Sequence, residues 1–215
     1  MSGCLIQKIL RNAPDPKEVR EAEILQSIRT TFAEKGFDGA SMQDLARAAG
    51  MSVGNFYRYF PSKTAMVTAI IKLDLAEVEE KFAEVINAAD PLAALRAGLA
   101  ERLAEDCVGC VDGPLWAEIN AVAARKSDIA DVVRGMEAEV IRLMTRAFAL
   151  IAGIPMPEAA QRFGSHAALV VMLVKSNSMQ GRIGAAATGR EDLLALMQRI
   201  LDVILNEVAS AKAGR

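Results

Sequence analysis

Apolar residues recur at intervals of three and four along most of this chain, and this spacing limits its fold more than any other feature. Between residues 16 and 35 they stand at Val19, Ala22, Leu25, Ile28 and Phe32. Such a spacing places them on one face of an α-helix. The alternating pattern of a half-buried strand does not appear, and Gly and Pro fall between the periodic segments. The sequence therefore predicts an all-α fold of about nine helices.

Helix caps and helix breakers give the bounds that we predict. Gly36 is expected to take a positive φ angle that ends the first helix, with Phe37 folding back on the last turn. Pro61, Pro91 and Pro157 are expected at or beside helix ends, because proline does not fit a helix interior. We expect helices at residues 16–35, 42–49, 53–59, 62–88, 91–107, 115–126, 127–153, 157–184 and 190–210.

Residues 41–59 have the caps and the turn of two short consecutive helices. Ser41 is expected to cap the first, with Asp44 at its third helical position near the positive end of the helix dipole. Gly50 can supply the positive φ angle of a tight turn, and Ser52 is expected to cap the second helix. Two short helices joined by a three-residue turn form a helix-turn-helix, whose second helix enters the major groove of DNA.

The second helix of this motif has one apolar anchor and a polar outer face. With Phe56 turned inward, helical spacing turns Asn55 and Arg58 outward, where they could read base edges. The only two tyrosines of the chain, Tyr57 and Tyr59, lie on the flanks, where their hydroxyls could reach phosphates. The slim residues that suit a close approach of its leading end to DNA are Val53 and Gly54.

Charge is distributed unevenly along the chain, whose net charge is -2. Residues 1–65 carry nine Lys and Arg against seven Asp and Glu, so the acidic excess lies in the remainder. Lys63, at the start of the next helix, would add a positive charge at phosphate distance. A mildly basic N-terminal part on an acidic body fits a local contact with a polyanion.

Residues 36–71, GFDGASMQDLARAAGMSVGNFYRYFPSKTAMVTAII, resemble the DNA-binding domain of TetR-family transcriptional regulators. The resemblance rests on G-x-x-x-x-S-M-x-D-L-A-x-A-A-G followed by S-x-G-x-F-Y-R-Y-F-x-S-K. The organisation we expect is a flexible arm at residues 1–16, a three-helix helix-turn-helix domain at 17–65, and a helical effector-binding and dimerisation domain at 66–215. The resemblance implies a regulator, most often a repressor, that a small-molecule effector releases from its operator.

The resemblance also implies roles for individual residues. Ser41 and Lys63 match phosphate-contacting positions, and Gln43 matches one that reaches a base. The positions that face the groove or its walls are Val53, Gly54, Asn55, Tyr57 and Tyr59. Val53 can offer only apolar contact, for example to a thymine methyl group.

The second domain contains candidates for an effector pocket. The only Trp of the chain lies near a Glu and an Asn, and the only His lies on an otherwise apolar helix with flexible and aromatic neighbours. The candidate lining is Trp116, Glu118, Asn120, Met144, Phe148, Phe163 and His166. An apolar pocket with few polar anchors suits a small, mostly hydrophobic effector. The alternative is that each of these is an ordinary core residue, with His166 a hydrogen-bonded interior histidine.

The last helix is apolar over more than one face, which a monomer would not need at its surface. The residues that indicate an interface are Leu193, Leu196, Ile200 and Ile204. The resemblance implies a two-fold homodimer through the last two helices. The alternative is a helix buried on two sides within one subunit.

Cysteine and histidine content bears on the remaining classes. Cys107-x-x-Cys110 has the spacing of a redox or metal motif, so a redox- or metal-sensing regulator on the same scaffold is the alternative function. A helical enzyme is the least favoured class, since the chain has one His and no phosphate-binding loop. We predict no catalytic residue, cofactor or metal, and no membrane partner. With neither a signal sequence nor a spanning segment apparent, we expect a cytoplasmic protein.

Overall fold

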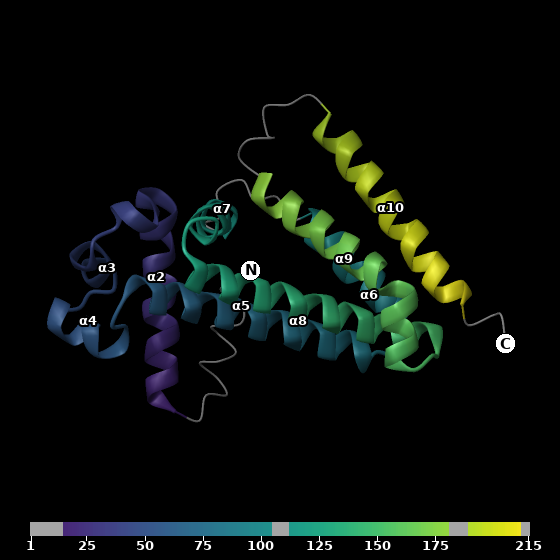
Figure 1. The fold of residues 1–215 in the computed structure, drawn as a ribbon, viewed down its shortest axis with the longest axis horizontal. Coiled ribbons are helices and arrows are strands. Elements are labelled where there is room, and N and C mark those ends of the chain that lie inside the picture. Colours follow the sequence, from purple (N-terminus) through teal and green to yellow (C-terminus); the bar gives the residue numbers. More distant parts are fainter. Residues whose placement is uncertain (1–14, 105–111, 181–188, 212–215) are drawn as a thin grey trace. The chain divides into compact units, whose positions relative to one another are not determined.

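The structure is a computed structural model that describes residues 15–104, 112–180 and 189–211 (Figure 1). Within these ranges the chain forms nine helices and no strand, which confirms the predicted all-α class. The helices are α2 (Pro16–Gly39), α3 (Met42–Ala48), α4 (Val53–Tyr59), α5 (Lys63–Ile86), α6 (Pro91–Ala104), α7 (Asp112–Ala123), α8 (Ser127–Ala152), α9 (Met156–Gln180) and α10 (Arg190–Ser210). The predicted arm lies almost wholly outside the described residues.

The first helix begins and breaks where local chemistry requires. The Asp15 carboxylate caps α2 by accepting a hydrogen bond from the backbone N–H of Lys17 at 2.8 Å. Gly36 interrupts the helical backbone with φ 71° and ψ 168°. Phe37 then folds back and stacks on Phe32 with ring centroids 6.1 Å apart, as the sequence predicted. The positive φ at Gly36 is confirmed, but its ψ is extended rather than left-handed helical.

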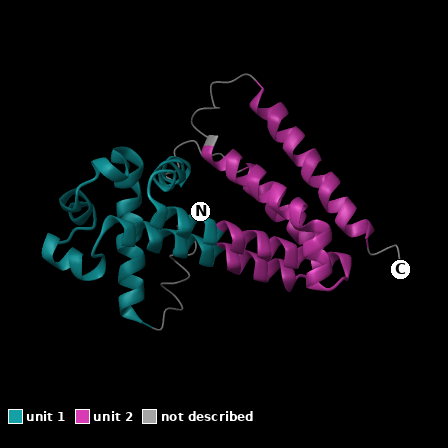
Figure 2. Ribbon diagram, viewed as in Figure 1, with its two compact units in different colours: residues 1–77, 110–136 teal, residues 78–109, 137–215 magenta. Residues whose placement is uncertain are grey.

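The described helices form two compact units (Figure 2). Unit 1 comprises Met1–Glu77 and Cys110–Met136, and unit 2 comprises Val78–Gly109 and Glu137–Arg215. This division differs from a boundary at residue 65, because α7 belongs to unit 1. The apolar side of α7 buries Leu115, Ile119 and Val122 in the same hydrophobic core as Phe32 and Phe37 of α2. Local periodicity does not predict this packing, because the contacting residues lie about 80 positions apart in sequence.

In unit 2, α6, α9 and α10 pack on one another around a separate hydrophobic core. Arg96 of α6 forms an ion pair with Asp202 of α10 and donates to Asn206 at 3.0 Å. Asn177 of α9 is buried and donates to the Leu103 carbonyl at 3.1 Å. Within the described ranges no single helix is both long and apolar enough to cross a bilayer, and α8 with α9 reaches that length only across a 115° bend.

Candidate nucleic-acid interface

The predicted cap of α3 is a complete capping box. The Ser41 hydroxyl accepts from the Asp44 N–H at 3.1 Å, and the Asp44 carboxylate accepts from the Ser41 N–H at 3.0 Å. Lys35 donates to the same carboxylate at 2.7 Å. This hydrogen bond, with those from Ser41, holds the pKa of the Asp44 carboxyl well below its usual range. The beginning of α3 is therefore fixed by its own side chains.

The turn into α4 also forms as predicted. Gly50 has φ 64°, and the Met51 N–H donates to the Ala46 carbonyl at 2.9 Å. The Ser52 hydroxyl then caps α4 by accepting from the Asn55 N–H at 3.3 Å. The two short helices and their tight turn thus form a helix-turn-helix in unit 1.

Burial on α4 follows the predicted faces. Phe56 is fully buried and lies 6.2 Å from the Phe60 ring, so it anchors the helix in the core of unit 1. The outer residues that are exposed are Gly54, Asn55, Tyr57 and Arg58, and Gln43 of α3 is exposed as well. Val53 and Tyr59 are half-buried and pack against the core. The orientation of α4 is confirmed, and contact of these side chains with DNA stays a prediction.

Lys63 has a different environment from the one that we predicted. Its ammonium group donates to three backbone carbonyls, those of Phe37 at 2.5 Å, Asp38 at 3.3 Å and Ala40 at 3.1 Å. It also lies 5.0 Å from the centre of the Phe37 ring. All three donor positions of the ammonium therefore have partners inside the protein. The sequence placed Lys63 correctly at the beginning of α5 but could not show which carbonyls lie beside it.

An ion cluster inside unit 1 was not predicted from the sequence. The Arg29 side chain is 2% exposed and donates to both carboxylate oxygens of Asp74, at 2.8 and 3.1 Å. It also donates to Asp112 at 2.6 Å, and the Trp116 ring N–H donates to Asp74 at 3.1 Å. Although burial opposes its charge, the carboxylates of Asp74 and Asp112 raise the pKa of the Arg29 guanidinium. Burial raises the pKa of Asp74, and the Arg29 charge limits that rise. The sequence contained one signal for this cluster: Arg29 stands on the apolar face of α2, three residues before Phe32.

The predicted effector pocket does not assemble within either unit. Trp116, Glu118 and Asn120 lie on α7 in unit 1, where each has a structural hydrogen bond. Trp116 contacts Asp74, Glu118 accepts from the backbone N–H of Phe37 at 2.7 Å, and Asn120 donates to the Trp116 carbonyl at 2.7 Å. The sequence predicts one pocket from these residues and others that lie in unit 2, because it does not reveal which groups Trp116, Glu118 and Asn120 contact.

The other four candidates lie in unit 2. Met144, Phe148 and Phe163 are buried in its hydrophobic core, and the rings of Phe148 and Phe163 meet edge to face at 6.4 Å. His166 is half-buried, with its ring 5.5 Å from Phe163 and its Nε2 atom 3.3 Å from Glu207. Three of the four are therefore core residues in this structure, which agrees with the alternative that we kept open.

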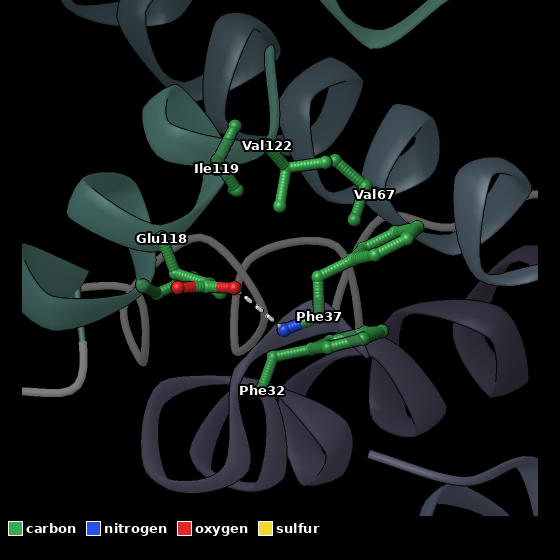
Figure 3. A pocket seen from close by; sticks show the side chains of 7 residues that line it. Phe32, Phe37, Val67, Glu118, Ile119 and Val122 are labelled. Carbon is green, nitrogen blue, oxygen red and sulfur yellow. Dashed lines mark hydrogen bonds between the residues drawn. The ribbon is translucent and has the colours of Figure 1, made fainter. Parts of the chain in front are cut away.

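A small cavity lies between α2, α5 and α7 in unit 1 (Figure 3). It is lined by Phe32, Phe37, Val67, Leu115, Glu118, Ile119 and Val122. The space admits about one water molecule, so it holds no organic effector in this conformation. In Figure 3 the Glu118 carboxylate points across the edge of this cavity to the Phe37 N–H.

The predicted interface helix, α10, has a mixed outer face. Leu193 and Leu196 are exposed, and Ile200 is half-buried. Ile204, which we predicted at the dimer interface, is only 5% exposed and belongs to the core of unit 2, in line with the alternative of a helix buried within one subunit. Val203, which we did not single out, is the most exposed large apolar residue of α10 at 66%.

The alternative sensor motif cannot be placed, since Cys107 and Cys110 lie outside the described residues. Within the described ranges no group of three or more His, Cys, Asp or Glu side chains could hold a metal ion.

Comparison with known proteins identifies the helix-turn-helix. Residues 24–70 match the family described as bacterial regulatory proteins, tetR family. Over 91 residues the chain is 35% identical to the HTH-type transcriptional regulator EthR of Mycolicibacterium smegmatis, covering 41% of this chain and 42% of that protein. Over 70 residues it is 36% identical to the HTH-type transcriptional repressor KstR2 of Rhodococcus jostii, covering 33% of this chain and 34% of that protein. These matches span less than half the length of either relative.

The fold extends the likeness beyond the matched segment. The solved structure of Salmonella enterica GusR superposes with a TM-score of 0.68 at 22% identity, covering 91% of this chain and 100% of that one. Residues 24–70 therefore carry the helix-turn-helix domain of the tetR family of bacterial regulatory proteins, and beyond them the likeness is one of fold.

Proposed function

We propose that this regulator represses transcription as a homodimer on operator DNA and leaves the operator when a small-molecule effector binds. The observation that supports DNA binding is the outer face of α4. Asn55, Tyr57 and Arg58 are exposed there, while Phe56 is buried and Ser52 caps the helix. A short helix that is rigid on its inner side and polar on its outer side suits the major groove.

The exposed residues divide by chemistry. The Asn55 amide can donate to and accept from one base edge at once, which is the usual contact to adenine. Arg58 can contact a guanine edge or a phosphate, and the hydroxyls of Tyr57, Tyr59 and Ser41 suit phosphates. Gln43 and the half-buried Val53 extend the same face as a second amide and an apolar contact. Lys63 is held by carbonyls, so we assign it to the structure of unit 1 rather than to phosphate.

Selection of bound duplexes from a random pool, followed by affinity measurements, tests these roles. We expect Asn55→Ala to relax preference at one base pair, at a cost of about 1–3 kcal/mol there. Tyr57→Phe should weaken binding to all duplexes alike and leave the consensus unchanged, because a phosphate contact carries no base information. Asn87→Ala is the matched control, since Asn87 is exposed in unit 2. An unchanged consensus for Asn55→Ala would contradict the role of Asn55 in reading a base.

Exposed apolar residues on α9 and α10 support the homodimer. Leu169 and Met172 of α9 are exposed, as are Leu193, Leu196 and Val203 of α10. A helix pair that leaves this many large apolar side chains in water is typical of a surface that another chain covers. Two copies would join α9 and α10 into a four-helix bundle.

The effector part of the proposal concerns unit 2. Met144 and Phe148 lie in an apolar core, so a small, mostly hydrophobic compound would enter by displacing flexible side chains. A tenfold loss of operator affinity requires that the compound bind the released state more tightly by about 1.4 kcal/mol. A thermal-shift screen of hydrophobic metabolites, followed by operator release, tests this. We place the protein in the cytoplasm, where operator DNA is accessible.

A further inference from the structure

The segment Gly36–Ala40 connects the regular part of α2 to the capped beginning of α3. It is short, and within it the Ala40 N–H donates a hydrogen bond to the Gly36 carbonyl at 3.1 Å. Its conformation sets the direction in which α3, and with it α4, leaves α2. Whatever holds this segment therefore positions the helix that faces DNA.

The Phe37 backbone is held by side chains from two other helices. Its N–H donates to the Glu118 Oε1 atom of α7 at 2.7 Å. Its carbonyl accepts from the Lys63 ammonium of α5 at 2.5 Å, and Lys63 reaches the Ala40 carbonyl as well. Both polar groups of this residue thus depend on charged side chains that are remote in sequence, and charge-assisted hydrogen bonds are stronger than neutral ones.

The turn after α7 holds the same segment from another side. The Lys126 ammonium lies 4.7 Å from the centre of the buried Phe37 ring. Arg125 and Lys126 both lie close to the Asp38 carboxylate, at 3.4 and 4.0 Å. These outer ion pairs are exposed and contribute little to stability. Their significance is that α7 and its following turn contact two consecutive residues of the connecting segment.

Glu118 fits its place closely. A Cβ atom on Gly36 would lie 3.1 Å from the Glu118 Oε1 atom, tighter than most such contacts, so the carboxylate occupies the space that Gly36 leaves. Figure 3 shows this carboxylate beside the cavity, directed at the Phe37 N–H. The half-buried position weakens competition from water for that hydrogen bond.

We propose that Glu118 is a positioning residue: its hydrogen bond to the Phe37 N–H fixes the segment Gly36–Ala40 and thereby the placement of the DNA-facing helices α3 and α4. A displacement of α7 relative to α2 would break or lengthen this bond and release the segment. The consequence for DNA rests on the proposed function, whereas the hold on the segment does not.

Amide hydrogen exchange of the full-length protein tests the hold directly. In Glu118→Ala we expect the Phe37 amide to exchange at least about tenfold faster, because its acceptor is gone. Glu118→Gln keeps the shape and a weaker acceptor, so it should lie between wild type and Glu118→Ala and guards against loss of the fold. Glu137→Ala, which removes a glutamate that pairs with Lys175 in unit 2, should leave Phe37 unchanged. The Ile28 amide in the middle of α2 should be unaffected in all variants.

Operator binding tests the positioning. With a duplex selected by the wild-type protein, we expect Glu118→Ala to lower affinity about tenfold and Glu118→Gln less, with the consensus unchanged. A merely structural role would lower the melting temperature without weakening DNA binding of the folded protein. Faster exchange at Phe37 with wild-type operator affinity would therefore overturn the positioning role. Unchanged exchange at Phe37 in Glu118→Ala would overturn the hold itself.

The two proposals fail in different ways. If the wild-type protein selected no duplex, the proposed DNA binding would be wrong. Exchange at the amides of α3, such as Leu45, would then decide the inference, because they exchange faster in Glu118→Ala only if Glu118 sets the placement of α3.

Discussion

Gly36→Ala adds one methyl group at the residue that interrupts the helical backbone of α2. Its effect on the free energy of unfolding can be estimated from the structure. The backbone there has φ 71° and ψ 168°, a combination that is essentially restricted to glycine and costs other residues about 1–3 kcal/mol. The new methyl group would also lie 3.1 Å from the Glu118 carboxylate and push it from the Phe37 N–H. We expect a total loss of about 2–4 kcal/mol in the free energy of unfolding.

Two other glycines separate the backbone strain from the contact. Gly50 has φ 64° but nothing within 4 Å of an added Cβ, so Gly50→Ala should cost only about 1–2 kcal/mol. Gly39 has neither a positive φ nor a close neighbour, so Gly39→Ala should be neutral or stabilise by up to about 1 kcal/mol. We therefore expect Gly39→Ala to be the most stable of the three variants, Gly50→Ala to be intermediate and Gly36→Ala to be the least stable.

Urea unfolding followed by circular dichroism gives these free energies, at one fixed protein concentration because a dimer's stability depends on it. A double-mutant cycle with Glu118→Ala then isolates the contact, since Gly36→Ala should cost less where the carboxylate is absent. Equal costs for Gly36→Ala and Gly39→Ala would refute the backbone argument. If Gly36→Ala lowered the free energy of unfolding equally in the wild type and in Glu118→Ala, the proposed contact between the new methyl group and the Glu118 carboxylate would be refuted.

Two further pairs of variants test the ion cluster and the apolar face. Arg29→Ala should destabilise by about 3–5 kcal/mol in the same unfolding assay, because it removes a buried guanidinium that neutralises the half-buried Asp74 carboxylate, whereas Arg20→Ala in an exposed pair should cost under about 1 kcal/mol. Val203→Glu should abolish the proposed dimer in sizing experiments and leave the helical content intact, whereas Ile204→Glu should unfold the chain because it buries a charge in the core of unit 2. A dimer that survives Val203→Glu would place the interface elsewhere.

The helices and the helix-turn-helix could be predicted because their signals are local. Ser41 and Ser52 cap helices that begin one residue later, and Gly50 turns the chain between them. Each of these effects depends on residues within four positions in sequence. The bounds of α3 and α4 accordingly agree with the prediction to within one residue.

Partners that are remote in sequence could not be predicted in the same way. Arg29 meets Asp74 and Asp112 at separations of 45 and 83 residues, and no periodic pattern connects them. The sequence predicts Lys63 at phosphate distance because it stands at the beginning of a helix and matches a phosphate-contacting position of the family that residues 36–71 resemble. Its three carbonyl partners belong to the segment that follows the break of α2 at Gly36, and such carbonyls near a helix end are available to side-chain donors.

The residues on α7 show that side chains typical of a ligand pocket can have structural partners instead. Trp116 and Glu118 combine an aromatic and a polar side chain, and this combination is also typical of the lining of a ligand pocket. In the structure the same chemistry faces α2 and α5, with the indole on Asp74 and the carboxylate on Phe37. Because α7 shares a hydrophobic core with the helix-turn-helix, a force that moves α7 acts on unit 1 itself. Under the proposed function, an effector that displaced α7 would act on α3 through Glu118 and the Phe37 N–H, without needing to touch the residues that we propose to face DNA.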